Sequence, residues 1–257
     1  MNSTMISRKA FITGGGTGIG KGIALWLAKC GYDVIISYYG SAAGAEDTVS
    51  CIEKLGRKAV AIRANVGKVE EIQRMFAEYR RHFSTLDLFV NNAGITKKAS
   101  FLETDETLFD QICSVDYKGA FFCMQEAAKL MVECGTAGSI VLISSNNAVA
   151  HFADVAVYAS VKQAATKMAE HAAIELAKYG IRVNTVAPGW TDTGATRLDD
   201  KASTYYKIPL QKWATVEEVA KTVEFLASDG AASITGSTIV VDNGALLVSD
   251  KLEKYGF

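Results

Sequence analysis

Three side chains have types and spacings suited to proton transfer: Ser145, Tyr158 and Lys162. Tyr158 and Lys162 lie four residues apart in the segment YASVK, which would place both on one face of a helix. A free tyrosine titrates near pH ~10 and is a poor base at neutral pH, but a neighbouring ammonium group stabilises its phenolate. Ser145 precedes Tyr158 by 13 residues and could donate a hydrogen bond to an oxygen that gains negative charge. The alternatives are a Tyr–Lys pair on an exposed helix face and a serine that caps a turn, and Ser144 is the adjacent rival.

A glycine-rich loop at residues 13–20, TGGGTGIG, could hold a phosphate-bearing ligand. The apolar run Arg8–Thr13 precedes it, and a helix-period segment from about Gly18 to Lys29 follows it. At the carboxyl end of a parallel strand, glycines let a pyrophosphate approach the backbone, and the helix that follows presents free amides. An ordinary structural turn is the alternative. The candidate binding residues in the loop are Gly14, Gly16, Thr17, Gly18, Ile19 and Gly20.

Strands and helices alternate from this loop almost to the end of the chain. After Arg8–Thr13, strands are predicted at DVIIS from Asp33, KAVAIRAN from Lys58, LDLFV from Leu86, GSIVLIS from Gly138, IRVNTVAP from Ile181 and STIVVD from Ser237. Helices are predicted between them, including those from about Ala42 to Leu55, Glu106 to Val132 and Ala156 to Lys178. Val- and Ile-rich strands separated by helices indicate a parallel sheet buried on both faces. The sequence therefore predicts one α/β domain over residues 1–257, a doubly wound, Rossmann-type, mostly parallel seven-stranded sheet with helices on both faces.

Composition excludes several classes of function. The 257 residues carry a formal net charge of −1, and no basic block offers a nucleic-acid footprint. The start of the chain has no apolar signal core, and no apolar run approaches the roughly 20 residues that span a bilayer. Five cysteines are scattered without a C-x-x-C or a pairing with the three histidines, so no metal site is expected. We expect a cytoplasmic protein whose partner is a small molecule rather than nucleic acid or membrane.

Further motifs follow the glycine loop, whose spacing is T-G-x-x-x-G-x-G. The tetrapeptide NNAG at residues 91–94 follows the fourth predicted strand, Ser145 and YASVK come next, and Pro188-Gly189 with Thr193 follows the sixth strand. In type, order and spacing, these motifs resemble the short-chain dehydrogenase/reductase family over nearly the whole chain. The resemblance implies an oxidoreductase that passes a hydride between the nicotinamide of NAD(P) and a carbonyl or secondary alcohol.

The resemblance also implies roles for individual residues. Ser145 would steady the developing charge, Tyr158 would transfer the proton, and Lys162 would also bond the nicotinamide ribose. Asn65-Val66 stands where the family often carries Asp-Val beside adenine, and an asparagine can still donate and accept there. The implied cofactor contacts beyond the glycine loop are Asn65, Val66, Asn92, Ala93, Gly94, Tyr158, Lys162, Pro188, Gly189, Thr191 and Thr193.

The choice between NAD and NADP rests on the end of the second predicted strand. An NAD site usually has an acid there that bonds the ribose hydroxyls. Asp33 starts the strand, whereas the ribose would lie at its end, which reads SYYGS without an acid. Tyr39 and Ser41 are the candidate contacts there. NADP is favoured over NAD, although Thr17 and Tyr39 stand where NADP-using relatives often carry Arg or Lys.

Substrate identity is less constrained. The side chains expected around the substrate are Asn147, Val149, His151, Phe152, Trp190 and a flap near Thr196–Tyr206, with His151 alternatively a loop-surface residue. The pattern resembles β-ketoacyl-carrier-protein reductases and sugar or polyol dehydrogenases most, and hydroxysteroid dehydrogenases less. Among these, a 3-oxoacyl-type reductase is favoured. RANV at Arg63 and TVEFLAS at Thr222 also resemble an enoyl-reductase branch, which normally widens the Tyr-to-Lys gap to six residues. The alternative of another class is a dinucleotide-binding sensor without catalysis.

Asp116 completes the candidate catalytic set and is the clearest departure from the family, which usually carries asparagine in this segment. Here the segment reads VDYKG at residues 115–119. In the family, that asparagine distorts the helix so that a backbone carbonyl holds a water linked to the lysine. An ionised Asp116 near Lys162 would favour the ammonium and shield the charge that stabilises the Tyr158 phenolate. A relay through the backbone carbonyl would be unaffected. We favour the second outcome and expect Asp116→Asn to retain activity within about tenfold, well below the effect of removing an acid–base group.

The helices that contain Asp116 and Tyr158 carry apolar residues beyond a single stripe: Phe121, Phe122, Met124, Ala164, Ala165, Met168 and Ala172. A helix with more than one apolar face needs a second surface to pack against. In the family these helices pair across subunits, so the resemblance implies a homotetramer, or at least a dimer.

Overall fold

A computed structural model describes residues 7–194 and 204–248. In this part of the chain, seven parallel strands form one sheet in the order β3-β2-β1-β4-β5-β6-β9. The strands are β1 (Lys9–Ile12), β2 (Asp33–Tyr38), β3 (Ala59–Arg63), β4 (Leu88–Asn91), β5 (Ser139–Ile143), β6 (Arg182–Pro188) and β9 (Thr238–Val241). Two short strands, β7 (Thr191–Asp192) and β8 (Ala214–Thr215), pair separately. The predicted α/β sheet is confirmed, and all its strands are parallel.

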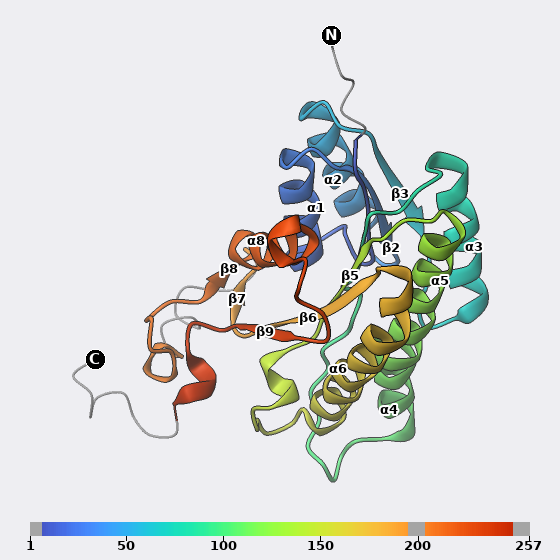
Figure 1. The fold of residues 1–257 in the computed structure, drawn as a ribbon. Coiled ribbons are helices and arrows are strands. Elements are labelled where there is room, and N and C mark those ends of the chain that lie inside the picture. The colour runs from blue at the N-terminus through green and yellow to red at the C-terminus, as the bar shows by residue number, and fades with distance from the viewer. Residues whose placement is uncertain (1–6, 195–203, 249–257) are drawn as a thin grey trace.

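Helices connect the strands and cover both faces of the sheet. The α-helices are α1 (Gly18–Lys29), α2 (Ala42–Lys54), α3 (Val69–His82), α4 (Glu106–Ile112), α5 (Ala120–Glu133), α6 (Ala156–Leu176) and α8 (Val216–Ala227). The π-helix η1 is Cys113–Gly119, and the 3₁₀ turns are η2 (Asn146–Ala148), η3 (Ala177–Tyr179), η4 (Tyr205–Lys207), η5 (Asp229–Ala231) and η6 (Ala245–Leu247). Figure 1 shows α1, α2 and α8 on one side of the sheet and α3, α5 and α6 on the other.

The alternation of side chains along the strands produces two cores. In β1, Phe11 packs among residues of α3, α5 and α6, whereas Ala10 and Ile12 pack among residues of α1, α2 and α8. Successive side chains of a strand point to opposite faces, so a strand buried on both sides must be apolar at every position. This is why the strands appear in the sequence as continuous apolar runs.

The order of strands reverses at β1: β2 and β3 lie on one side of it, and β4, β5, β6 and β9 lie on the other, so that β1 and β4 are neighbours in the sheet. The loops after these strands therefore diverge and leave a crevice at the carboxyl edge. Thr13 joins the two strand ends, because its hydroxyl accepts hydrogen bonds from the Asn92 and Ala93 amides at 3.0 Å each. The Asn92 side-chain amide donates to the Thr13 carbonyl at 2.9 Å. The glycine loop and the NNAG segment are thus held together at the point of reversal.

One predicted helix differs from the structure. The continuous helix expected from Glu106 to Val132 is divided into α4, the π-helix η1 and α5. A π-helical turn inserts a residue into the helical repeat and is frequently found at functional sites. Hydrophobic periodicity did not predict it, because the apolar positions continue through the segment. The interruption turns Asp116 inward, where it is 1% exposed.

None of the helices in the described ranges is long and apolar enough to cross a membrane.

Candidate active site

A cavity of about 550 Å³ lies over the crevice between β1 and β4. It is lined by Gly14, Thr17, Gly18, Ile19, Gly20, Ser37, Tyr38, Tyr39, Gly40, Ala64, Asn65, Val66, Asn92, Ala93, Gly94, Ile95, Val115 and Thr193. Most of the residues predicted to contact a cofactor are among them. The lining combines the amino terminus of α1 with the carboxyl ends of four strands, which is the arrangement that receives a dinucleotide in doubly wound sheets.

The glycine loop is shaped by close backbone contacts. A Cβ atom added at Gly20 would lie 2.3 Å from the Gly14 carbonyl oxygen and 2.5 Å from the Asn92 amide nitrogen. Gly14 and Gly18 have φ angles of +68° and +54°, a region that side chains disfavour. These positions need glycine, and the loop leaves space that side chains would fill. The cavity therefore fits a pyrophosphate-bearing ligand.

Several predicted contacts lie outside that lining. Gly16 faces α2, where an added Cβ would come 3.2 Å from the Ala45 amide. The Ser41 hydroxyl accepts a hydrogen bond from the Gly44 amide at 3.2 Å and caps α2. Pro188 ends β6 and is buried. Beyond it, the Thr191 hydroxyl donates to the Gly189 carbonyl at 3.0 Å, which stabilises the turn that follows this strand.

The sequence did not single out Ser37, Tyr38, Gly40, Ala64, Ile95 and Val115, which also line the cavity. Most lie at the carboxyl ends of strands or just beyond them, so their position in the predicted sheet could have identified them. Arg63, at the end of β3, was also missed as a neighbour of Tyr39. Its guanidinium lies 5.8 Å from the centre of the Tyr39 ring. This contact joins two strand ends and places a cation next to Tyr39, which lines the cavity.

Asp33 lies away from this cavity at the start of β2. Its carboxylate accepts hydrogen bonds from Lys9 Nζ at 2.7 Å and from the Lys58 amide at 3.0 Å. Although burial opposes the effect, these bonds lower the pKa of Asp33 to about 2. The carboxylate therefore serves the structure, as its position at the wrong end of the strand predicted.

Tyr158 and Lys162 lie in the first turns of α6. The Lys162 ammonium is 5.6 Å from the centre of the Tyr158 ring and donates a hydrogen bond to the Ile143 carbonyl oxygen at 3.3 Å. Lys162 is 5% exposed, whereas Tyr158 lines an open cleft of about 250 Å³. The lysine is thus buried next to a tyrosine that faces the open cleft.

Ser145 follows β5 at the same edge of the sheet. Its Oγ accepts hydrogen bonds from the Asn147 backbone amide at 3.2 Å and from the Asn147 side-chain nitrogen at 3.1 Å. Two donors on the oxygen leave the Ser145 hydroxyl proton available for donation. The neighbouring Ser144 instead donates to the Lys162 carbonyl at 3.3 Å and lies 2.8 Å from the Thr166 hydroxyl. Ser144 therefore attaches α6 to β5, and only Ser145 is oriented for other partners.

Asp116 contacts the lysine directly. One carboxylate oxygen accepts a hydrogen bond from the Ile95 amide at 2.8 Å, and the other lies 3.2 Å from Lys162 Nζ. Burial raises the pKa of Asp116, while the charge of Lys162 and the Ile95 amide oppose that rise. Lys118, two residues further along η1, is exposed. The structure thus brings Asp116 and Lys162 together across 46 residues of chain.

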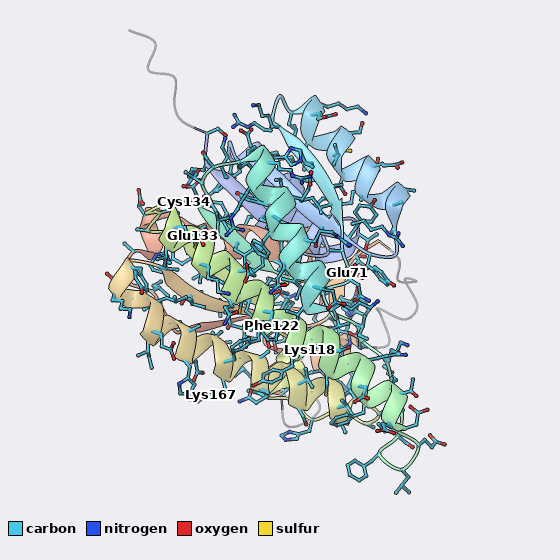
Figure 2. The ribbon with its side chains drawn as sticks, turned by 90° about the vertical axis from the view of Figure 1, so that its right-hand side faces the viewer. Glu71, Lys118, Phe122, Glu133, Cys134 and Lys167 are labelled. Carbon is cyan, nitrogen blue, oxygen red and sulfur yellow. The ribbon has the colours of Figure 1, made fainter. Side chains whose placement is uncertain are left out.

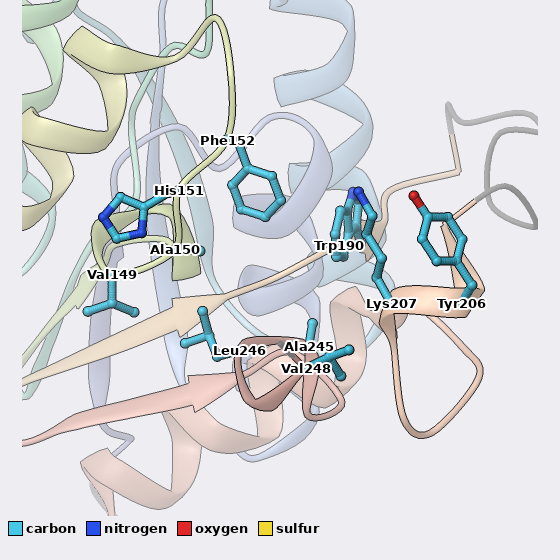
Figure 3. Close-up of a pocket in the computed structure, with 10 residues that line it drawn as sticks. All are labelled: Val149, Ala150, His151, Phe152, Trp190, Tyr206, Lys207, Ala245, Leu246 and Val248. Atoms are coloured by element: carbon cyan, nitrogen blue, oxygen red, sulfur yellow. The ribbon is translucent and has the colours of Figure 1, made fainter. Parts of the chain in front are cut away.

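Two adjoining cavities lie outside the β1–β4 crevice, and Tyr158 lines one of them. The cleft that contains Tyr158 is also lined by Thr96, Lys98, Asn146, Asn147, Phe152, Ala153, Val155, Gly189 and Trp190. A second cavity, of about 600 Å³, is lined by Val149, Ala150, His151, Phe152, Trp190, Tyr206, Lys207, Ala245, Leu246 and Val248 (Figure 3). Phe152 and Trp190 line both and pack edge to face, with ring centres 5.5 Å apart. This aromatic pair divides the cleft from the outer cavity.

The substrate residues expected from the sequence are distributed over these two cavities. Asn147 lines the cleft, and Val149 and His151 line the outer cavity. Of the predicted flap at Thr196–Tyr206, residues 196–203 lie outside the described part of the chain, and Tyr206 lines the outer cavity. Within the described ranges, no group of three or more His, Cys, Asp or Glu residues is arranged to hold a metal ion.

Comparison with known proteins identifies the family. A family model described as enoyl-(acyl carrier protein) reductase matches residues 14–245. The chain is 38% identical over 244 residues to a 3-oxoacyl-[acyl-carrier-protein] reductase, FabG, of Staphylococcus aureus, which covers 93% of this chain and 98% of that protein. It belongs to the short-chain dehydrogenase/reductase family.

Other members of the short-chain dehydrogenase/reductase family with different named activities are similar too. L-rhamnose 1-dehydrogenase (NAD(P)(+)) of a Sphingomonas species is 35% identical over 242 residues, which cover 92% of this chain and 95% of that protein. The crystal structure of an acetoin dehydrogenase, YohF, from Salmonella typhimurium superimposes with a TM-score of 0.89 at 31% identity, covering 95% of this chain and 98% of that one. The protein is therefore an NAD(P)-dependent oxidoreductase of this family.

Proposed function

We propose that the protein is an NADPH-dependent reductase of 3-oxoacyl-type ketones. The observation that carries this proposal is the arrangement around Tyr158, with the Lys162 ammonium behind its ring and the Ser145 hydroxyl oriented by Asn147. The similarity to 3-oxoacyl-[acyl-carrier-protein] reductase supports the substrate class. Reduction of an enoyl group is less well supported, because Tyr158 and Lys162 are four residues apart rather than six.

The site's own residues account for the proton that reduction requires. When bound, the nicotinamide supplies the hydride that a carbonyl carbon receives. Tyr158 gives its hydroxyl proton to the substrate oxygen, and the Ser145 hydroxyl donates a hydrogen bond to the same oxygen as charge develops there. The Lys162 ammonium stabilises the phenolate that remains. In this proposal Gly14 to Gly20 and Asn92 to Gly94 hold the cofactor, and Lys162 also bonds its ribose.

Arg63 supports a preference for NADPH. It is exposed at the end of β3, next to the ring of Tyr39, which lines the cofactor cavity, and Ala64 and Asn65, which follow it, line the cavity too. A guanidinium forms strong, often bidentate hydrogen bonds with phosphate, and stacking on an aromatic face restricts its motion. No carboxylate appears among the cavity-lining side chains of the described residues, so the lining does not repel a 2′-phosphate.

Arg63→Ala is expected to weaken NADPH binding about tenfold, because a hydrogen bond to a charged group contributes about 1.5–3 kcal/mol. Binding of NADH should change little, since NADH lacks the 2′-phosphate. Titration of nicotinamide fluorescence with both cofactors measures the difference, and Arg74→Ala, which removes an exposed arginine of α3, is the control. An equal loss of affinity for NADPH and NADH would mean that Arg63 does not contact the 2′-phosphate.

The adjoining cavities favour a substrate with a tail. The cleft around Tyr158 holds about 250 Å³, and the outer cavity beyond Phe152 and Trp190 adds about 600 Å³. A 3-oxoacyl thioester would place its keto group near Tyr158 and its remaining length across the aromatic pair. Sugars need many polar partners, whereas much of this lining is aromatic or aliphatic.

The proposed function is tested by following 340 nm absorbance with NADPH or NADH and a panel of 3-oxoacyl thioesters, diketones and aldoses. We expect the highest kcat/KM with NADPH and a 3-oxoacyl thioester. Greater activity on acetoin or on a sugar would favour the second candidate, a small-ketone or sugar dehydrogenase, which the acetoin and rhamnose enzymes support. Cofactor binding without turnover of any of these substrates would favour the other alternative, a dinucleotide-binding sensor without catalysis.

We also propose a homotetramer built on α5 and α6, which lie side by side on one face of the molecule (Figure 2). A groove between the two helices is lined by Tyr117, Phe121, Met124, Gln125, Ala128, Met168, His171, Ala172, Glu175 and Leu176. Phe121 is 43% exposed and Ile174 is 75% exposed, and both belong to these helices. Ala165, one of the apolar residues noted in the sequence, is instead buried in the core of the subunit.

Phe121→Glu is expected to reduce the assembly to a smaller species, because a charge in an apolar interface is left without a partner. Light scattering coupled to size-exclusion chromatography measures the mass. Phe225→Glu is a matched control on α8, on the other side of the sheet, where the phenylalanine is 42% exposed. A wild-type monomer at micromolar concentration would contradict the assembly proposal.

A further inference from the structure

The buried carboxylate of Asp116 is the feature of the site that proton transfer by Ser145, Tyr158 and Lys162 leaves unexplained. Asp116 lies in the π-helix η1 and is 1% exposed. Charged groups are rarely buried to this extent without a partner, because the loss of hydration is costly. The carboxylate must therefore either be paired or carry a proton.

The surroundings of Asp116 hold the carboxylate against the lysine. Its Oδ1 accepts the Ile95 amide hydrogen at 2.8 Å. Its Oδ2 lies 3.2 Å from Lys162 Nζ and, among the described residues, has no hydrogen bond of good geometry. Gly94 closes the other side, since an added Cβ would lie 2.7 Å from Oδ2 and 3.2 Å from Nζ. A neutral asparagine could make the Ile95 contact equally well, but only a carboxylate supplies a negative charge to Lys162.

We propose that Asp116 is the buried counter-ion of Lys162 and sets the pH range in which Tyr158 works, keeping the phenol protonated near neutral pH and thereby favouring carbonyl reduction over alcohol oxidation. The proposal rests on the proposed function, because it acts through the roles given there to Tyr158 and Lys162. Asp116 is a positioning residue in this scheme, since it touches the lysine rather than the substrate.

The physical basis is the charge that Tyr158 experiences. An isolated ammonium behind the ring favours the phenolate, which is the form needed to accept a proton from an alcohol. A carboxylate in contact with that ammonium brings the net charge of the pair to zero and opposes the phenolate. Reduction needs the opposite form, a phenol with a proton to give. The carboxylate thus favours the protonation state that reduction uses.

Few other charges face this pair in the described part of the chain. Tyr158 faces the ammonium from the same helix, and Ile143 contributes a backbone carbonyl from β5. Cys113 of η1 lies within electrostatic range of Asp116, whose carboxylate adds to the effect of burial in raising the pKa of that thiol. Lys98 lines the cleft with Tyr158 and is the cation among the lining residues there. Substitution of Asp116 therefore changes the net charge of the Asp116–Lys162 pair next to Tyr158 and leaves the other charged residues near Tyr158 in place.

The test is the pH profile of kcat for Asp116→Asn, measured in both directions between about pH 5 and 10. We expect both profiles to shift toward acid by about one pH unit, because the Lys162 ammonium, 5.6 Å from the centre of the Tyr158 ring, loses its counter-charge, and a charge at roughly this distance alters proton affinity by 1–3 units. The maximal rates should stay within about tenfold, since no proton-transferring group is removed. Asp110→Asn, which removes an exposed carboxylate of α4, should leave the profiles unchanged.

A second measurement does not depend on turnover. Titration of ¹³Cζ-labelled tyrosine in the enzyme without cofactor, with Tyr158→Phe identifying the resonance, reports ionisation of the phenol directly. In Asp116→Asn, the Tyr158 phenol should ionise at a lower pH than in the wild type. Asp116→Ser replaces this variant in the experiment if Asp116→Asn does not fold. An unchanged titration would overturn the proposal, as would a hundredfold loss of maximal rate in a folded variant. If instead Tyr158→Phe stays active, the proposed function fails while this titration still tests the counter-ion.

Discussion

Tyr158→Phe is expected to retain cofactor binding and to lose nearly all turnover. The substitution removes only the hydroxyl group, and Tyr158 lines the substrate cleft rather than the cofactor cavity. General acid–base groups contribute about 10²–10⁴-fold to rate, so a loss in that range is predicted. Initial rates at 340 nm measure turnover, and nicotinamide fluorescence measures binding.

Tyr179→Phe is the matched control for that experiment. Tyr179 lies in η3, directly after α6, and is 45% exposed, so its hydroxyl should not affect the rate. A Tyr158→Phe enzyme that keeps more than about a tenth of the wild-type rate would assign proton transfer to another group, because that loss is too small for an acid–base residue.

Lys162→Met is expected to lower both activity and stability. The variant removes the positive charge behind Tyr158 and leaves the Asp116 carboxylate buried without its ionic partner. Loss of the electrostatic stabilisation should cost about 10²–10³-fold in kcat. Breaking a buried ion pair from one side destabilises a protein by about 3–5 kcal/mol, and we expect a loss near the lower end at neutral pH. Urea denaturation measures the free energy of unfolding.

The stability loss should depend on pH in a defined direction. Burial already raises the pKa of Asp116, and removal of Lys162 takes away the charge that opposes that rise. In the variant, the folded state then binds this proton more tightly than the unfolded state does. Relative to the wild type, the destabilisation should therefore be small below the raised pKa that Asp116 has in the folded wild type. Above that pKa it should grow by about 1.4 kcal/mol per pH unit until the pH passes the still higher pKa of Asp116 in the folded variant.

A double variant separates the two effects of Lys162→Met. Adding Asp116→Asn removes the unpaired charge, so much of the lost stability should return while the activity does not. Lys167→Met is the control on the same helix, because Lys167 is exposed and pairs with Glu170 at the surface. A Lys162→Met enzyme as stable as the wild type at pH 8 would contradict this account and would mean that the Asp116 carboxylate reaches water or another partner in the variant.

The order of strands and helices could be predicted because it depends on local patterns. Strands buried on both faces read as apolar runs, and the predicted Gly18–Lys29 helix has the bounds of α1. Strand ends differ by one or two residues, as at Leu88, where the sequence suggested a start at Leu86. The π-helix was missed because its apolar spacing resembles that of an α-helix. Its effect, the inward rotation of Asp116, appears only when the neighbouring helix and strand are in place.

The candidate site could be predicted in part for the same reason. The spacing of Tyr158 and Lys162 places them on one helix face whatever the rest of the fold does. The partners of these residues were not predictable, because they come from distant segments. Ile143 receives the Lys162 hydrogen bond, Asn147 orients Ser145, and Arg63 stacks on Tyr39.

The sequence by itself determined the parallel sheet, the glycine loop at the end of β1 and the helical Tyr–Lys pair, since each follows from residue types a few positions apart. The tertiary structure alone decided that Asp116 meets Lys162 and that Phe152 and Trp190 lie between the two cavities near Tyr158. Those contacts join residues far apart in the chain. Side-chain spacing cannot specify them, because they depend on how helices and loops pack against one sheet edge.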